Sequence, residues 1–252
     1  MIKKERITEL LIEIKESWYI AIKDAKVYFF KAPNLTYSFL IPISLFLAFY
    51  ISNKIEPTII ISGLTVLVIL FGTTSIEAVS VVLEKQTGTL ERLLTAPVSF
   101  FHILLGKVLA GTLFGLITAS ITIIPLTIIF VTLVINLPFI IISILITSIC
   151  FSALGVVISA YAKWVPEAQM ISNFIRFPMV FICGTFTSLN LLSPQQHIIA
   201  LFLPLTYSIE AFRTSLNTPQ SSLNFLLNIS ILIVFSLTFL IIAAEILKKR
   251  TK

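Results

Sequence analysis

The sequence predicts an all-α membrane protein with six transmembrane helices, an N-terminal interfacial helix and a re-entrant helical hairpin before the last span. Three observations predict this fold class. Of the 252 residues, 57% are hydrophobic and only 12% are charged, whereas a soluble domain carries about 25% charged residues. The mean hydropathy is +1.03. Several apolar segments also approach or exceed the roughly 20 residues that a helix needs to cross a bilayer.

Residues 1–32 are expected to form an amphipathic helix on the cytoplasmic membrane surface. Apolar residues recur there at steps of three and four between Ile7 and Phe29, and charged residues occupy the opposite face. Trp18 and Tyr19 suit the headgroup region. The segment lacks the uninterrupted apolar run of a cleaved signal peptide, so the first span would act as the insertion signal. A soluble helix packed on a partner protein is the alternative.

Residues 33–252 are expected to form one transmembrane domain, in which prolines and short polar stretches separate six spans. The expected spans are 35–51, 58–83, 103–134, 139–161, 168–189 and 223–247. Between the last two, residues 193–222 contain apolar pieces that Pro204 interrupts. Each piece is too short to cross, which predicts an outer hairpin. In the third span, Gly111 and Gly115 form a GxxxG motif that should allow close helix packing within the subunit.

The distribution of basic residues predicts a multi-pass protein of the plasma membrane with both termini in the cytoplasm. The expected outer segments hold only Lys54 and Arg213, whereas the basic tail from Lys248 to Lys252 and most other basic residues fall inside. This bias satisfies the positive-inside rule. A further crossing within 193–222 would move the tail outside. Lipid headgroups and topology therefore explain the net charge of +6, and we expect no nucleic-acid partner.

The sequence contains no pattern typical of a catalytic or metal site. His102 and His197 fall on opposite sides of the expected membrane, and the residues around Gly106 do not make a P-loop. Cys150 and Cys183 lie in apolar segments and are interpreted as small core residues. We expect this chain to be no enzyme and to hold no cofactor or metal of its own.

Four charged residues in or near the apolar segments are candidates for gating or for structural pairing: Glu77, Arg176, Glu210 and Arg213. A charge inside a membrane is costly and is usually functional. For Glu77 we favour a position at the inner interface or an ion pair with Arg176. Glu210 and Arg213 lie three residues apart, so on a helix they can pair as a structural clasp in the outer hairpin.

The most informative polar stretch covers residues 84–97, EKQTGTLERLLTAP, between the second and third expected spans. Residues 89–95 can form a short helix, which Gly88 allows to begin sharply and Pro97 to end sharply. Its three leucines then share one face: Leu90, Leu93 and Leu94. A rigid cytoplasmic projection of this kind could transmit force from a soluble partner. On physical grounds alone, an ordinary amphipathic connector is the simpler interpretation.

This stretch resembles the coupling helix of ABC-2 type transporter permeases, the membrane subunits of one class of ATP-driven exporters. The residues that match the family's Gly-Thr-Leu-Glu core and the Leu-Leu-x-x-Pro after it are Gly88, Thr89, Leu90, Glu91, Leu93, Leu94 and Pro97. The resemblance implies that the leucines fill a groove of an ATP-binding subunit. It adds candidates for polar contacts or for the coupling interface: Glu84, Lys85, Glu91 and Arg92. Gly106 and Lys107 match the start of the family's third span.

Two weaker matches follow downstream. Residues 183–186, CGTF, resemble the small-Gly-x-Phe at the end of the family's fifth span, although Thr187 stands where a proline is usual. Residues 203–213 resemble the Leu-Pro-x-x-Tyr and Glu-x-x-Arg elements of its outer hairpin. With these matches, the resemblance covers most of the chain.

The resemblance implies a permease that exports a small molecule, lipid or glycan. The permease would be a homodimer, or a heterodimer with a similar chain, and two ATP-binding subunits would hold ATP and Mg. Closure of these subunits would push the coupling helix and rock the permease halves apart. The residues do not identify the cargo. Alternatives are a secondary transporter, which would show broken helices and paired midplane charges, a membrane-embedded enzyme, and a membrane assembly factor without an ATPase partner.

Overall fold

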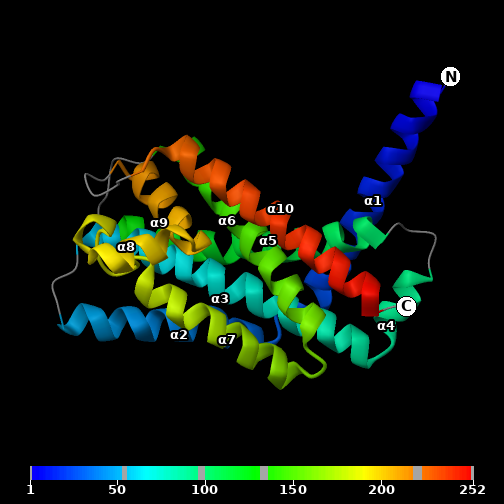
Figure 1. Ribbon diagram of the computed structural model, residues 1–252, viewed down its shortest axis with the longest axis horizontal. Coiled ribbons are helices and arrows are strands. Elements are labelled where there is room, and N and C mark those ends of the chain that lie inside the picture. Colours follow the sequence, from blue (N-terminus) through cyan, green and yellow to red (C-terminus); the bar gives the residue numbers. More distant parts are fainter. Residues whose placement is uncertain (1, 53–55, 96–99, 131–135, 218–222, 251–252) are drawn as a thin grey trace.

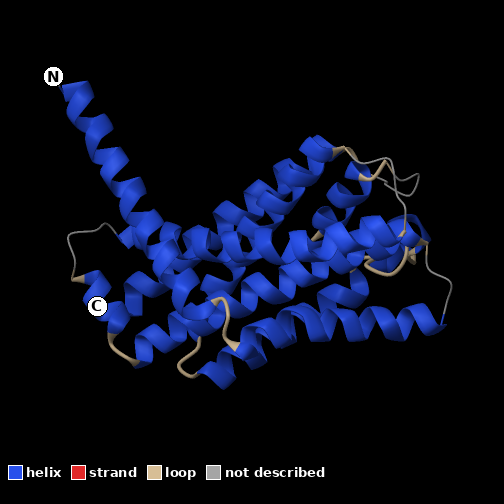
Figure 2. Cartoon of the chain, turned by 180° about the vertical axis from the view of Figure 1, so that it is seen from behind, coloured by secondary structure: helices blue, strands red, loops and turns tan. Residues whose placement is uncertain are grey.

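The computed structural model describes residues 2–52, 56–95, 100–130, 136–217 and 223–250. Regular structure in these ranges is helical (Figure 2). The elements are α1 (Ile2–Tyr28), α2 (Ala32–Ser52), α3 (Pro57–Gln86), α4 (Thr89–Leu94), α5 (Phe100–Ile129), α6 (Leu137–Tyr161), α7 (Val165–Ile182), the 3-10 helix η1 (Leu189–Leu191), α8 (Pro194–Leu201), α9 (Pro204–Ser215) and α10 (Phe225–Arg250). The all-α prediction is thereby confirmed for the part of the chain that the structure describes.

Among the described residues, four helices are long and apolar enough to cross a membrane: α3, α5, α6 and α10. α2 takes the place of the first expected span and offers a shorter apolar stretch, Asn34–Ala48. α7 takes the place of the fifth and ends at Ile182, short of the expected residue 189, because Gly184 turns the chain with a φ of 71°. The end of the third expected span, 131–134, lies outside the described residues. The count of six spans stays a prediction.

The centre of the fold is α3, whose apolar stretch is buried along its whole length. It packs against α2, α5, α6 and α7, and Figure 1 shows it crossing the middle of the bundle. α10 packs against α6 and α9 on the other side. A helix that is apolar all round and buried all round is the expected core of a membrane bundle.

Small residues bring α3, α5 and α6 into close contact. A Cβ atom at Gly115 would lie 2.7 Å from Cγ2 of Thr73, and Cβ atoms at Gly111 and Gly155 would each lie 2.9 Å from the side chain of Glu77. Side chains at these positions would force the helices apart. Packing of the GxxxG motif within the subunit, as predicted, is confirmed.

α1 lies along the first half of α5, but its packed face differs from the expected apolar stripe. Ser17 and Asp24 are buried, whereas the indole of Trp18 is 46% exposed. The Ser17 hydroxyl donates a hydrogen bond of 2.9 Å to the carbonyl of His102 at the start of α5. The expectation that every charge lies opposite the packed face is therefore wrong for Asp24, because α5 supplies it with a buried partner.

The segment before α10 forms two short helices, α8 and α9, which meet at Pro204. The Ser193 hydroxyl accepts a hydrogen bond from the backbone of Gln196 and caps α8. α9 packs against α6 and α10. The predicted break at Pro204 is confirmed. The re-entrant path of this hairpin stays a prediction, and its residues 218–222 lie outside the described part.

Candidate coupling site

The short helix α4 projects from the end of α3 at the position that the sequence predicts. The backbone of Gly88 is left-handed, with a φ of 69° and a ψ of 6°, and lets the chain turn from α3 into α4. No atom lies within 4 Å of a Cβ built at Gly88. The backbone conformation, and not lack of space, therefore favours glycine here. The Arg92 amide closes the first turn by donating to the Gly88 carbonyl at 3.3 Å.

The side chains of α4 divide between the protein and its surface. Glu91 and Arg92 are exposed, and Leu93 is half-buried. Leu90 is only 8% exposed because α4 folds back on α3. Leu90 therefore contributes to the chain's own packing, contrary to the expectation of a face of three leucines turned outward. The side chain of Leu94, and all of Pro97, lie outside the described residues.

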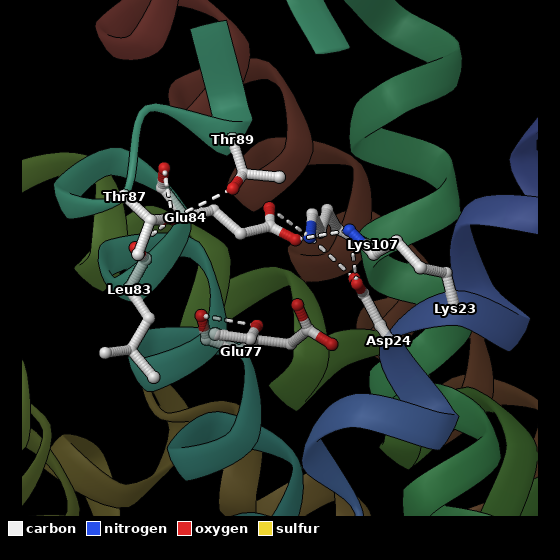
Figure 3. Close-up of polar contacts among 9 residues, drawn as sticks. Lys23, Asp24, Glu77, Leu83, Glu84, Thr87, Thr89 and Lys107 are labelled. Carbon is white, nitrogen blue, oxygen red and sulfur yellow. Dashed lines mark hydrogen bonds and ion pairs between the residues drawn. The ribbon is translucent and has the colours of Figure 1, made fainter. Parts of the chain in front are cut away.

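Four charged side chains from three helices meet beneath α4 (Figure 3). Lys23 and Asp24 come from α1, Glu84 from α3 and Lys107 from α5. The Lys107 ammonium lies 2.6 Å from Asp24 and 2.5 Å from Glu84, and the Lys23 ammonium lies 2.9 Å from Asp24 and 2.5 Å from Glu84. Each cation thus contacts both carboxylates. We call these four residues the charge cluster.

The charge cluster is buried on one side and open on the other. The side chains of Asp24, Glu84 and Lys107 are at most 3% exposed, whereas that of Lys23 is 37% exposed. Burial lowers the pKa of Lys23, but the carboxylates of Glu84 and Asp24 outweigh it, so the pKa lies above its usual value. Burial, with the nearby Glu84 and Asp24, also raises the pKa of Tyr28 to about 12. Two cations and two anions in alternation keep each buried charge compensated.

A second set of contacts fixes the end of α3 to the end of α6. The Lys85 ammonium donates to the carbonyls of Ser159, at 2.5 Å, and Ala160, at 3.4 Å. The Gln86 amide donates to the carbonyl of Lys163 at 3.1 Å. The Ser159 and Ala160 carbonyls lie in the last turn of α6, where acceptors have no partners in the helix, and Lys163 follows that helix. The base of α4 is therefore held by α1, α5 and α6 together.

The positions of the predicted site residues thus agree only in part with the prediction. Glu91 and Arg92 face outward as expected. Glu84 and Lys85 point into the chain and bind α1, α5 and α6 instead of facing a partner surface. Lys23 and Lys107, which bind Glu84, and Asp24, which shares both lysines with it, were not predicted from the sequence. A lysine inside an apolar span does indicate a nearby acid.

Glu77 lies two helical turns deeper on α3 than Glu84. It is 1% exposed and sits where Gly111 and Gly155 make room between α5 and α6. Figure 3 shows it below the charge cluster. The expected ion pair with Arg176 is wrong, because Arg176 instead stacks over the ring of Phe71, with its guanidinium carbon 5.2 Å from the ring centre.

The predicted pair of Glu210 and Arg213 is confirmed. Arg213 Nη1 lies 3.1 Å from Glu210 Oε1, and both side chains are at most 1% exposed. Arg213 Nη2 also donates to the carbonyls of Gly184, at 2.8 Å, and Thr187, at 2.9 Å. The pair therefore holds the turn after α7 against α9, which is the structural role expected of a clasp.

Several known proteins are similar in sequence to this chain. The family model of the ABC-2 type transporter matches residues 12–217. The inner membrane transport permease YadH of Escherichia coli strain K12 is 25% identical over 166 residues, which cover 66% of this chain and 64% of that protein. Nodulation protein J of Rhizobium leguminosarum bv. viciae is 29% identical over 106 residues, 42% of this chain and 40% of that protein.

The chain thus spans slightly less than two thirds of the length of YadH, at 64%. The family match is broader, and it includes α4, the charge cluster and the clasp. Apolar helices of spanning length accord with the membrane location that the name of the permease relative states. This chain therefore belongs to the ABC-2 type transporter family and is a protein of the cell membrane.

Proposed function

We propose that this chain is the permease subunit of an ABC transporter and that a separate ATP-binding subunit acts on it through α4. One observation carries the proposal: α4 exposes Glu91 and Arg92 on the protein surface, and α1, α5 and α6 hold its base. A short helix on a loose loop would bend under load. A short helix on a fixed base passes its displacement into α3, α5 and α6.

The charges beneath α4 supply that fixed base. Glu84 ends α3 between Lys23 and Lys107, and Lys85 holds the end of α6. A push on α4 would therefore move α1, α3, α5 and α6 as one body rather than unwinding the end of α3. Movement of packed helices between two arrangements is a common form of switching in proteins.

Membership of the family supports the rest of the proposed assembly. Two such chains, or this chain and a similar permease, would form the pathway, and two ATP-binding subunits would hold ATP and Mg. The start of α1 and the end of α10 lie toward the α4 end of the bundle (Figure 1). This position supports placing both termini in the cytoplasm. The cargo would be a small molecule, lipid or glycan, moved outward at the expense of ATP hydrolysed by the partner.

Two other functions are tested alongside this one. A secondary transporter would need paired charges at mid-membrane, whereas Glu77 and Arg176 do not pair. An assembly factor would need no ATPase at all. Both alternatives predict that α4 can be altered without effect on any ATP hydrolysis.

The test compares two leucine-to-aspartate variants of the tagged chain in its own cells. Leu93→Asp alters α4, and Leu191→Asp alters an 80% exposed position at the opposite end of the bundle. After mild solubilisation, the wild type and Leu191→Asp should retain a P-loop ATPase whose rate depends on the chain. Leu93→Asp should lower that chain-dependent rate about tenfold, the factor that corresponds to roughly 1.4 kcal/mol.

In size-exclusion chromatography, each variant should elute at the same volume as the wild type, which shows that it is folded. Absence of any ATPase from the wild-type complex would refute the proposal. An undiminished rate with folded Leu93→Asp would show that α4 is not the coupling element.

A further inference from the structure

The most unusual charge in this molecule is Arg176, in the middle of α7. It is 0% exposed, and its Nε, Nη1 and Nη2 atoms have no hydrogen-bond partner among the described residues. The Phe71 ring on α3 lies 5.2 Å from the guanidinium carbon, and Tyr37 on α2 lies close enough to interact with Arg176 electrostatically. Phe71 lies halfway along α3, so Arg176 sits near the middle of the helix bundle.

An arginine in this position is costly. Unpaired charges in a low-dielectric interior are strongly disfavoured, and charges within membrane helices usually mark a pathway for ions or substrates. A cation–π contact with Phe71 offsets only part of that cost. Within the described ranges, the five N–H groups of the guanidinium have none of the acceptors that usually accompany a buried arginine.

Arg176 ends a line of polar groups along α7. The residues Gln169, Ser172, Asn173 and Arg176 are spaced by three, four and seven positions and so share one face of the helix. Each has a buried polar atom with no hydrogen-bond partner in the described part of the chain. α7 runs antiparallel to α3, because Arg176 contacts Phe71 and the carbonyl of Thr185 lies near Gly63. The line thus leads from the α4 end of the bundle to its middle.

The opposite face of α7 is apolar. Met170 is 67% exposed and Phe174 is 81% exposed, whereas Arg176 is turned inward against α3. A carboxylate on a second copy packed against that apolar surface would not reach the guanidinium. A ligand that enters between α7 and α3 would reach it. The neighbours of Arg176 favour a ligand with an apolar part, since Phe71 also packs on Phe177 with ring centres 6.0 Å apart.

We propose that Arg176 binds the negative charge of the cargo, and that the cargo is an amphipathic anion with a phosphate or carboxylate on an apolar body. This inference rests on the proposed transport function. In the present conformation Phe71 covers the guanidinium. Separation of α7 from α3 would expose it, and the unpartnered hydroxyl of Ser172 would add a hydrogen-bond donor along the approach.

The test uses the purified full-length chain alone, in an uncharged detergent. The probe is dodecyl phosphate, and the comparison compounds are inorganic phosphate and dodecyltrimethylammonium. Dodecyl phosphate should raise the Tm of the wild type saturably, by roughly 5 °C when it is far above its Kd. Arg176→Lys should keep part of the shift, and Arg176→Gln should lose it.

Three results would overturn the inference. One is an equal shift by dodecyl phosphate in Arg176→Gln and in the wild type. Another is an equal shift of the wild type by dodecyltrimethylammonium, which would show that the anion is irrelevant. The third is an equal shift by inorganic phosphate, which would refute the apolar body and indicate a small anion.

A second measurement separates a binding role from a structural one. Without ligand, Arg176→Met should have a higher Tm than the wild type, because it removes a buried charge that lacks partners. A lower Tm would indicate that Arg176 stabilises the fold, which would contradict the inference.

The two proposals fail in different ways. Dodecyl phosphate binding is measured without an ATPase, so it does not depend on coupling through α4. If dodecyl phosphate causes no Arg176-dependent rise in Tm while ATP hydrolysis still depends on α4, only the proposed cargo class is refuted. Intact binding with no ATPase partner would refute only the ABC transporter function.

Discussion

Two fully buried arginines in this chain have opposite environments. Arg213 faces Glu210 and the carbonyls of Gly184 and Thr187, whereas Arg176 faces the ring of Phe71. Both are 0% exposed, so burial alone does not distinguish them. The difference lies in their partners. A buried charge with partners holds two segments together, and one without partners remains available to a ligand that comes and goes.

The charge cluster belongs with Arg213 in this comparison. Lys107 is as deeply buried as the arginines, and it contacts both Asp24 and Glu84 at 2.5–2.6 Å. Partnered charges therefore lie at both ends of the bundle, beneath α4 and beside the turn after α7. Arg176 lies between them. The partnered charges hold the two ends of the bundle, and among the described residues the buried arginine without a hydrogen-bond partner for any of its side-chain nitrogens lies in the middle.

The largest effect is expected from Lys107→Met. It leaves two buried carboxylates that only the half-exposed Lys23 can neutralise. Breaking a buried ion pair from one side costs about 3–5 kcal/mol, so the free energy of unfolding in detergent should fall by that amount. Lys26→Met, an exposed position on α1, is the control. A loss of less than about 1 kcal/mol, which is typical of a surface ion pair, would show that the charge cluster does not hold helices together as the Arg213 pair does.

A smaller but still large effect is expected at the clasp. Arg213→Met leaves Glu210 buried without its cation and should cost about 3 kcal/mol. The double variant with Glu210→Met should cost less than the sum of the two single variants, since no charge is left alone. Thermal unfolding of the four proteins measures this coupling. Strict additivity would mean that the two side chains act independently.

Gly88→Ala should have an intermediate effect. Nothing crowds this position, so the cost is the left-handed backbone alone, about 1 kcal/mol. Gly88→Asn should cost less, because asparagine tolerates this conformation. If α4 couples, Gly88→Ala should also reduce chain-dependent ATP hydrolysis more than Gly88→Asn does. Equal hydrolysis in both variants would show that the direction of α4 does not matter.

The smallest effect is a loss of stability at alkaline pH. The folded-state pKa of Lys23 lies above its ordinary value, so its stabilising contribution is complete below that value and is lost as pH rises. Tyr28, with a folded-state pKa of about 12, acts in the same direction between its ordinary value of 10.0 and 12. Tyr28→Phe should therefore flatten the decline in Tm above pH 10. An unchanged slope would exclude Tyr28 as a contributor.

Features that depend on neighbouring residues could be predicted from the sequence. The Glu210–Arg213 pair follows from a spacing of three on a helix, and the sharp turn into α4 follows from Gly88. The close packing of α5 follows from Gly111 and Gly115. Each of these rules concerns positions on one element, where geometry is fixed by the helical repeat.

Features that depend on how the helices are rotated against one another could not be predicted from the sequence. Glu84 meets Lys23 and Lys107, which are far away in sequence, only because α1 and α5 pack beside the end of α3. The Glu77–Arg176 pair was wrong because Gly111 and Gly155 open a space for Glu77 on another side of α3. An apolar stripe does not fix the rotation of a helix that is apolar on every face. The partner of a buried charge then has to be read from the structure.

The central claim, that α4 contacts the ATP-binding subunit, is tested most directly by cross-linking from Arg92. Cys150 and Cys183 are both buried, so a surface cysteine can be labelled selectively. Arg92→Cys carrying a benzophenone should cross-link to an ATP-binding subunit in native membranes. Leu191→Cys with the same label, at the opposite end of the bundle, should not. Cross-linking from residue 191 but not from residue 92, or from neither, would contradict the account.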